Sequence, residues 1–365
     1  MSHLFEPLVL RSVTLANRIA VSPMCQYSCT DGLANDWHLV HLGSRAVGGA
    51  GLVFTEATAV TPQGRISPQD LGLWNDAQIE PLAHITHFIG QRGSVAGIQL
   101  AHAGRKASTP PPWQSRAETL TEAEGGWQPV APSPIAFESG CRVPAALTQE
   151  DIAGIVMAFA RAAQRALAAG FRVVEVHAAH GYLLHEFLSP LTNQRTDRYG
   201  GSFDNRTRLV RDVVTAVRNF WPEELPLLIR ISASDWLPGG WDVEQSLELV
   251  RLLAPLGVDL VDCSSGGTSP QAVISLGPGY QTRFAEQIRR ETGCLTAAVG
   301  LITAPAQADH IIRTGQADLV LLARELLRDP YWPLRAAREL RHPVPWPAQY
   351  LRSAPPHTPP YLPGG

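Results

Sequence analysis

Two histidines and a tyrosine stand close together in the segment EVHAAHGYLL, as His177, His180 and Tyr182. The segment opens with a short β-rich run, so these side chains are expected where a strand ends. Metal-dependent hydrolysis would need several histidines and carboxylates, and an HxxH spacing alone is weak evidence for zinc. We therefore interpret His177 and His180 as paired hydrogen-bond donors to a substrate oxygen, with Tyr182 beside them.

A second set of residues, near the end of the chain, predicts a phosphate site. Gly300 closes the apolar run TAAVG, and Ala323 and Arg324 close the run LVLLAR. Backbone N–H groups at Gly300 and Ala323, together with the Arg324 guanidinium, would hold a dianion. A P-loop is excluded because the one lysine of the chain, Lys106, follows Arg105 and no Gly-Lys-Ser/Thr occurs.

Arg230 lies inside the apolar run LLIRIS, where an unpaired charge is costly unless it points toward an open end. It needs a fixed anion, and no acidic residue is obviously positioned by the sequence to supply one. The prediction is a negatively charged cofactor, and a reduced flavin carries such a charge at N1.

The elements that must position these residues are short β-rich runs separated by helical patterns. One helical pattern, DIAGIVMAFARAAQRALAAG, ends at Gly170, a residue suited to a helix C-terminus. Eight such βα units predict an α/β fold, the (β/α)8 TIM barrel. A Rossmann sheet is disfavoured because no run precedes GxGxxG, and the nearest match, GPGYQT, lacks the third glycine. The predicted strands are 18–22, 51–56, 95–100, 173–177, 227–232, 260–264, 296–300 and 319–324.

The chain of 365 residues exceeds the roughly 250 that a minimal barrel needs. We expect one domain over 1–365, with the excess in an N-terminal extension (1–17) below the barrel, a Pro/Trp-rich loop after the third strand (101–144) and a Pro-rich tail (342–365). None of these segments has a periodic apolar pattern of its own, which a separate domain would show.

Composition narrows the function classes further. A formal net charge of −3 and the absence of a basic stripe exclude the electrostatic case for nucleic acid or an anionic membrane. Five scattered cysteines form no disulfide framework, no apolar segment is long enough to span a membrane, and the first residues lack a signal-peptide core. These features predict a cytoplasmic protein.

Several motifs together resemble the Old Yellow Enzyme family of flavin-dependent ene-reductases, over essentially the whole chain. Within that family the sequence is similar to the bacterial subgroup of xenobiotic reductases and thermophilic-like members. The motifs are ANRIAVSPMCQYS, DWHLVHLGSRAVGGAGLVFTEATAV, IQLAHAGRKAS and EVHAAHGYLLHEFLSPLTNQRTDRYGGSFDNRTRL, with the last two strand-end loops.

The resemblance implies bound FMN, NADPH as its reductant, and a set of residues around the flavin. Cys25 would lie near the N5/O4 edge and tune the redox chemistry, Gln99 would contact the pyrimidine ring with a donor and an acceptor, and Arg230 would face N1/O2. The cofactor-binding residues implied are Ser22, Pro23, Met24, Cys25, Ala57, Gln99, Arg230, Val299, Gly300, Ala323 and Arg324. Some relatives carry tryptophan at the position of Val299, so the volume of the active site differs here.

On the substrate side, the resemblance implies a ping-pong reaction in which an activated alkene follows NADPH into one cavity. His177 and His180 would bind a carbonyl or nitro oxygen, Tyr182 would protonate the α-carbon, and Tyr27 would close over the ligand. The subgroup also sends an arginine from one subunit's tail into its neighbour's site, and Arg352 matches it, which implies a homodimer or homotetramer. Two alternatives remain: a barrel aldolase or isomerase acting on a phosphorylated substrate, and a flavin-binding protein without turnover.

Overall fold

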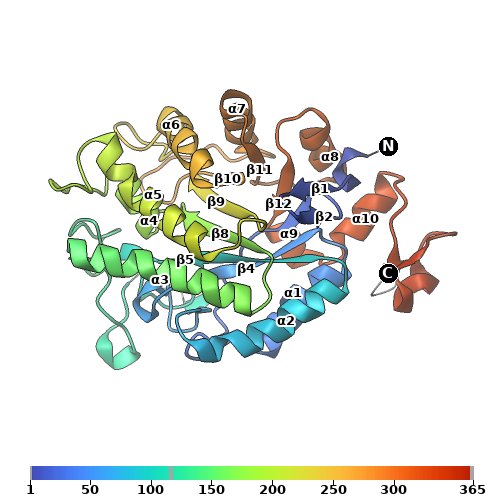
Figure 1. Cartoon of the computed structure of the whole chain (residues 1–365), viewed down its shortest axis with the longest axis horizontal. Coiled ribbons are helices and arrows are strands. Elements are labelled where there is room, and N and C mark those ends of the chain that lie inside the picture. The colour runs from blue at the N-terminus through green and yellow to red at the C-terminus, as the bar shows by residue number, and fades with distance from the viewer. Residues whose placement is uncertain (1, 115–117, 362–365) are drawn as a thin grey trace.

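The eight predicted apolar runs all form strands, and these close into a parallel barrel in a computed structural model of the chain (Figure 1). The structure describes residues 2–114 and 118–361. The strands follow one another around the barrel in chain order, which confirms the TIM-barrel prediction. The barrel strands are β3 (Ile19–Val21), β4 (Leu52–Ala59), β5 (Val95–Ala101), β8 (Val173–Ala178), β9 (Leu227–Ser232), β10 (Leu260–Ser264), β11 (Leu295–Ala298) and β12 (Leu319–Leu322).

Helices follow the strands and form the outer layer of the barrel, as Figure 1 shows. Two short helices instead follow strand ends closely, so they belong to the rim that carries the predicted site: α4 begins at Leu183 soon after β8, and α9 begins at Arg324 just after β12. The helices are α1 (Asp36–Val47), α2 (Ile79–Gln91), α3 (Gln149–Ala168), α4 (Leu183–Leu188), α5 (Phe203–Phe220), α6 (Val243–Leu253), α7 (Thr282–Thr292), α8 (Pro305–Arg313), α9 (Arg324–Arg328) and α10 (Trp332–Glu339). None of the described helices is long and apolar enough to cross a membrane.

Helix α3 shows how local sequence sets the ends of these elements. It begins two residues before the predicted Asp151, because Thr148 and Asp151 form a reciprocal capping box that satisfies the first backbone donors. It ends just before Gly170, whose φ of 83° reverses the chain into β8. The capping box and the glycine therefore set the two ends of this helix.

The N-terminal extension covers the end of the barrel opposite the site. Its antiparallel hairpin joins β1 (Leu8–Leu10) to β2 (Val13–Leu15), and the Ser12 N–H donates to the Glu224 carbonyl, 3.1 Å away, just before β9. The Leu4 N–H donates to the Asp309 carboxylate on α8 at 3.0 Å. The extension thus closes the N-terminal ends of the strands, where a TIM barrel carries stability and not chemistry.

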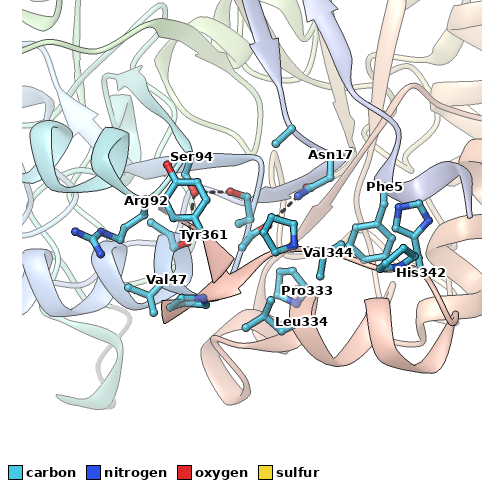
Figure 2. A pocket seen from close by; sticks show the side chains of 18 residues that line it. Phe5, Asn17, Val47, Arg92, Ser94, Pro333, Leu334, His342, Val344 and Tyr361 are labelled. Carbon is cyan, nitrogen blue, oxygen red and sulfur yellow. Dashed lines mark hydrogen bonds between the residues drawn. The ribbon is translucent and has the colours of Figure 1, made fainter. Parts of the chain in front are cut away.

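The C-terminal tail packs at that same end and encloses a cavity (Figure 2). The tail contains β13 (Trp346–Pro347) and β14 (Pro360–Tyr361), which pair with each other. The cavity, about 240 Å³, is lined by Asn17, Ala50 and Ser94, which precede strands β3, β4 and β5, and by tail residues including Tyr361. Because its walls are the starts of strands, this cavity is separate from the strand ends that carry the predicted chemistry.

The described residues of the segment between β5 and α3 are mostly irregular. It contains three 3₁₀ turns (Gly104–Lys106, Pro112–Gln114 and Glu122–Glu124) and the short strand β6 (Val130–Ala131), which pairs with β7 (Ala145–Ala146). The first turn carries Lys106 into the site described next.

Candidate active site

His177, His180 and Tyr182 cluster at the C-terminal end of β8. The ring centroid of His177 lies 5.2 Å from that of His180 and 5.1 Å from that of Tyr182, both edge to face. His177 is buried, and its Nδ1 has no hydrogen-bond partner among the described residues. Such an atom usually marks a missing partner, so the cluster is open to a ligand.

The loop that carries His180 is held by hydrogen bonds from neighbouring strands. The His180 N–H donates to Ser232 Oγ on β9 at 2.9 Å, and His180 Nε2 lies 2.7 Å from Ser264 Oγ on β10. The Gly181 N–H donates to His185 Nδ1, and Asp235 holds the other ring nitrogen of His185 at 3.1 Å. His180 has a φ of 60°, a left-handed conformation that such surrounding contacts must maintain.

Both histidines are neutral at neutral pH. Burial and the neighbouring Arg230 guanidinium lower the pKa of His177 and of His180 well below the usual value. Burial raises the pKa of Tyr182 well above the ordinary value, so its hydroxyl keeps its proton. The cluster therefore presents neutral donors and a protonated phenol.

Lys106 joins this cluster from the turn after β5. Its Nζ donates to the carbonyls of His180 (3.0 Å) and Gly267 (3.2 Å) and lies 5.2 Å from the Tyr182 ring centroid. Burial and the neighbouring Arg105 lower its pKa to about 8. Two carbonyl acceptors make this amine a structural cation at the site.

Cys25 and Tyr27 approach from the loop after β3, and Glu56 in the middle of β4 fixes that loop. The Gln26 N–H donates to Glu56 Oε2 at 3.0 Å, and His38 Nε2 lies 3.1 Å from Glu56 Oε1. Tyr27 has a φ of 50°, and its ring contacts the Trp113 ring edge to face at 5.7 Å. Burial raises the pKa of Cys25 well above the usual value, so the thiol stays protonated.

The barrel interior corrects the prediction that no acidic residue pairs with Arg230. Its Nε lies 2.9 Å from Asp262 Oδ2, because Asp262 on β10 is the register partner of Arg230 on β9. Its Nη2 also donates to Ser22 Oγ at 3.3 Å. Glu175, two residues before His177, accepts from Gln99 Nε2 at 2.8 Å. The arginine thus has a fixed protein anion, and no cofactor charge is needed to explain its burial.

Neither Asp262 nor Glu175 was singled out from the sequence, although the sequence pattern marks both of them. Asp262 interrupts the apolar run LVDCS and Glu175 interrupts VVEVH, the same anomaly that singled out Arg230. Alternation along a strand places residue i and residue i+2 on one face, so Glu175 shares the inward face of His177. Pairing across strands, which depends on barrel register, joins Arg230 to Asp262.

The predicted phosphate residues line a small pocket of about 200 Å³ between the loops after β11 and β12. Gly300 has a φ of 118°, and a Cβ there would lie 2.9 Å from Gln281 Nε2, so a side chain would strain the backbone and crowd the loop. Arg324 is exposed at the start of α9 and forms no ion pair with any described residue. Its guanidinium is therefore available to an anion.

The other predicted cofactor residues border the same end of the barrel. Ser22 is buried and bonds to the Leu322 carbonyl, while Ala57 and Gln99 are register partners on β4 and β5. Val299 is buried, and its carbonyl accepts from Gln281 Nε2. Pro23 and Met24 are half-buried in the loop after β3. No group of three or more potential metal ligands occurs in residues 2–114 and 118–361.

The chain matches the NADH:flavin oxidoreductase / NADH oxidase family over residues 3–342. It is 50% identical to an NADPH dehydrogenase of Bacillus licheniformis, across 96% of this chain and 98% of that one, and 46% identical to an NADPH dehydrogenase of Bacillus subtilis with the same coverage. Among solved structures it resembles morphinone reductase, with a TM-score of 0.79 and 29% identity over 94% of this chain and 91% of that one. It also resembles the old yellow enzyme homologue from Zymomonas mobilis, with a TM-score of 0.76 and 25% identity over 97% of each chain.

The residues present suit a flavin mononucleotide. The pocket at Gly300 would not admit a side chain without strain, Arg324 forms no ion pair with a described residue, and the buried Nδ1 of His177 has no hydrogen-bond partner among those residues. The resemblance drawn from the motifs and the cofactor prediction of FMN with NADPH are confirmed. The chain is an NAD(P)H-dependent flavin oxidoreductase and belongs to the NADH:flavin oxidoreductase / NADH oxidase family, with the Old Yellow Enzymes among its relatives.

Proposed function

We propose that this enzyme reduces activated alkenes, in particular α,β-unsaturated carbonyl compounds, and nitro compounds. The observation that carries the proposal is the unpartnered Nδ1 of buried His177, with the rings of His180 and Tyr182 around it. Neutral imidazoles in a desolvated pocket suit a carbonyl or nitro oxygen on which negative charge develops. The aldolase or isomerase alternative loses its support, because Lys106 is bonded to two carbonyls and the family is one of oxidoreductases.

Each residue has a distinct part in this proposal. FMN held in this site and reduced by NADPH would supply the hydride that the β-carbon receives. His177 and His180 hold the substrate oxygen and polarise the double bond, and Tyr27, with Trp113 against it, bounds the cavity. Tyr182 delivers its proton to the α-carbon, a role supported by burial that keeps the phenol protonated. General acid catalysis of this kind contributes about 10² to 10⁴-fold.

We also propose that the cofactor residues act as the motifs imply. Gln99 and Ala57 hold the pyrimidine ring, Arg230 faces its N1/O2 side, and Cys25 lies at the N5/O4 edge. The remaining contacts come from Ser22, Pro23, Met24 and Val299, with Gly300, Ala323 and Arg324 at the phosphate. Register pairing of Ala57 with Gln99, and of Arg230 with His177, supports this grouping.

A stopped-flow experiment on Tyr182→Phe tests the proposal. Holoenzyme reduced with NADPH is mixed with 2-cyclohexenone in the absence of oxygen, and flavin reoxidation is followed by absorbance. We expect reoxidation to slow by about 10² to 10⁴-fold while reduction by NADPH keeps its rate. Reoxidation at the parent rate would remove the proton-donor role, and a parent enzyme that enones do not reoxidise would remove the ene-reductase proposal.

Arg352 belongs to the tail, other residues of which line the cavity at the starts of the barrel strands. It is exposed in the 3₁₀ turn Ala348–Ser353 of the tail, and the tail packs at the opposite end of the barrel from His177. We propose that Arg352 completes the site of a neighbouring copy in a homodimer or homotetramer. We also propose that the protein is cytoplasmic. Arg352→Ala should raise KM for the alkene without changing the mass measured by light scattering, whereas an unchanged KM contradicts the contribution.

A further inference from the structure

A buried polar network crosses the barrel interior on adjacent strands, and the proposed FMN contacts of Gln99 and Arg230 do not explain its two carboxyl groups, Glu175 and Asp262. Gln99 on β5 pairs in register with Glu175 on β8, and Arg230 on β9 pairs with Asp262 on β10. The exposed fractions of these four side chains are 1%, 0%, 5% and 0% in that order. Buried ionisable groups of this kind are expensive to keep, so their retention calls for a physical reason.

The hydrogen bond between Gln99 and Glu175 selects one orientation of the Gln99 amide. Gln99 Nε2 donates to Glu175 Oε1 at 2.8 Å, and an oxygen acceptor at that place requires the NH₂ end of the amide to face it. Rotating the amide by 180° would put two oxygens against each other when the Glu175 carboxyl is ionised. Burial and the neighbouring Asp262 carboxylate raise the pKa of Glu175 to about 8, so the carboxylate fixes the amide fully above that pH. The Gln99 carbonyl oxygen and one N–H are then left free in a fixed order.

That order matters because the pyrimidine edge of FMN is asymmetric. It presents one N–H between two carbonyl oxygens, so it needs an acceptor and a donor in a defined sequence. An amide free to rotate offers the matching order only part of the time. In the other orientation its donor faces a flavin donor and its acceptor faces a flavin acceptor. A partner that holds the amide in the correct order therefore strengthens binding without touching the flavin.

We propose that Glu175 is a positioning residue for FMN, which it serves by fixing the amide orientation of Gln99. The inference rests on the proposed contact between Gln99 and the pyrimidine ring. Glu175 Oε2 has no hydrogen-bond partner among the described residues, so packing and the single bond to Gln99 hold the carboxyl in place. The Arg230–Asp262 ion pair lies beside this bond and supplies the one guanidinium of the network.

The test is a double-mutant cycle on the refolded or reconstituted holoenzyme, with the FMN dissociation constant as its readout. Glu175→Gln keeps shape but offers Gln99 either an oxygen or an NH₂, so both amide orientations become possible. At pH 9, where the parent carboxyl is ionised, we expect FMN to bind about 5- to 20-fold more weakly, the effect of losing one well-oriented hydrogen bond. In the Gln99→Leu background, the same Glu175→Gln change should alter the dissociation constant less than twofold, because Glu175 acts through Gln99.

A spectroscopic readout separates this role from simple stabilisation of the core. With ¹⁵N-labelled FMN bound, the N3 resonance should be displaced or doubled in Glu175→Gln. Thr296→Val is the matched control, since Thr296 is equally buried on β11 and its hydroxyl is likewise unpartnered. The control should leave both the N3 resonance and the dissociation constant unchanged.

Three results overturn the inference: an unchanged dissociation constant in Glu175→Gln, an unchanged N3 resonance, or an equal loss of affinity with and without Gln99. If Glu175→Gln does not fold, Glu175→Met keeps the length of the side chain with apolar packing and should weaken FMN at least as much. An unchanged FMN dissociation constant in Gln99→Leu alone would instead overturn the Gln99 contact in the proposed function, so the two failures are distinguishable.

Discussion

The ammonium of Lys106 lies 5.2 Å from the centre of the Tyr182 ring while it bonds to the carbonyl of His180. One side chain from the turn after β5 thus braces the loop after β8 and places a positive charge beside the proposed proton donor. A cation at that distance stabilises negative charge on the phenol oxygen as the proton leaves.

Replacing Lys106 by methionine should slow alkene reduction by about 10- to 100-fold, because both the brace and the cation are lost. Reoxidation of the NADPH-reduced enzyme by an enone is the measurement. Since the pKa of Lys106 is about 8, the parent rate should fall as pH rises through 8, where the amine loses its charge. If the reoxidation rate of Lys106→Met still falls as pH rises through 8, the fall is caused by another group.

Glu56→Gln should loosen the loop after β3. A glutamine cannot accept from both the Gln26 N–H and His38, so one donor stays unpaired. We expect a loss of about 1 to 3 kcal/mol in unfolding free energy and a rise of several-fold in KM for the alkene, since Tyr27 is no longer held at a φ of 50°. A lower melting temperature with an unchanged KM would show that Glu56 contributes to stability and not to substrate binding.

Gly300→Ala should weaken FMN binding by about tenfold or more, because an alanine at a φ of 118° is strained and its Cβ crowds Gln281. Isothermal titration of the apoenzyme with FMN measures the effect. Gly277→Ala is the control, because a Cβ there meets no atom within 4 Å and its φ is not in the left-handed region. If Gly300→Ala and Gly277→Ala bind FMN with equal affinity, Gly300 has no role in binding the phosphate.

Stability should depend on pH through Glu186, which is fully buried and accepts from the Arg105 N–H at 2.8 Å. Burial raises its pKa from the usual 4.5 to about 8, so between these values the folded state binds more protons than the unfolded state. The free energy of unfolding must then fall as pH rises from about 4.5 to 8.

Glu186→Gln should reduce the fall in unfolding free energy between pH 4.5 and 8, by on the order of 2 kcal/mol. Chemical denaturation at several pH values measures this change. The exposed Glu150→Gln serves as control and should keep the parent slope. If the unfolding free energy of the parent and of Glu186→Gln depends on pH to the same extent, the Glu186 carboxyl ionises in the folded protein as readily as in the unfolded chain.

The barrel could be predicted from sequence because its strands are near-continuous apolar runs, and residues at strand ends of such a barrel meet at one rim. His177, His180 and Tyr182 were found for that reason. Asp262 and Glu175 could not be placed, because their partners depend on which strands are neighbours and in what register. Arg230 was accordingly assigned a cofactor as its partner, whereas the adjacent strand already supplies a carboxylate.

The contact between Tyr27 and Trp113 has a consequence for altering this enzyme. Trp113 belongs to the long segment after β5 and is 66% exposed, so it can be exchanged without opening the core. The groups proposed to hold FMN lie instead on barrel strands and on the loops after β3, β11 and β12. Residues 112–114 contribute none of the proposed FMN contacts, so substitutions there offer a way to reshape the wall beside Tyr27 while the proposed cofactor contacts are left in place.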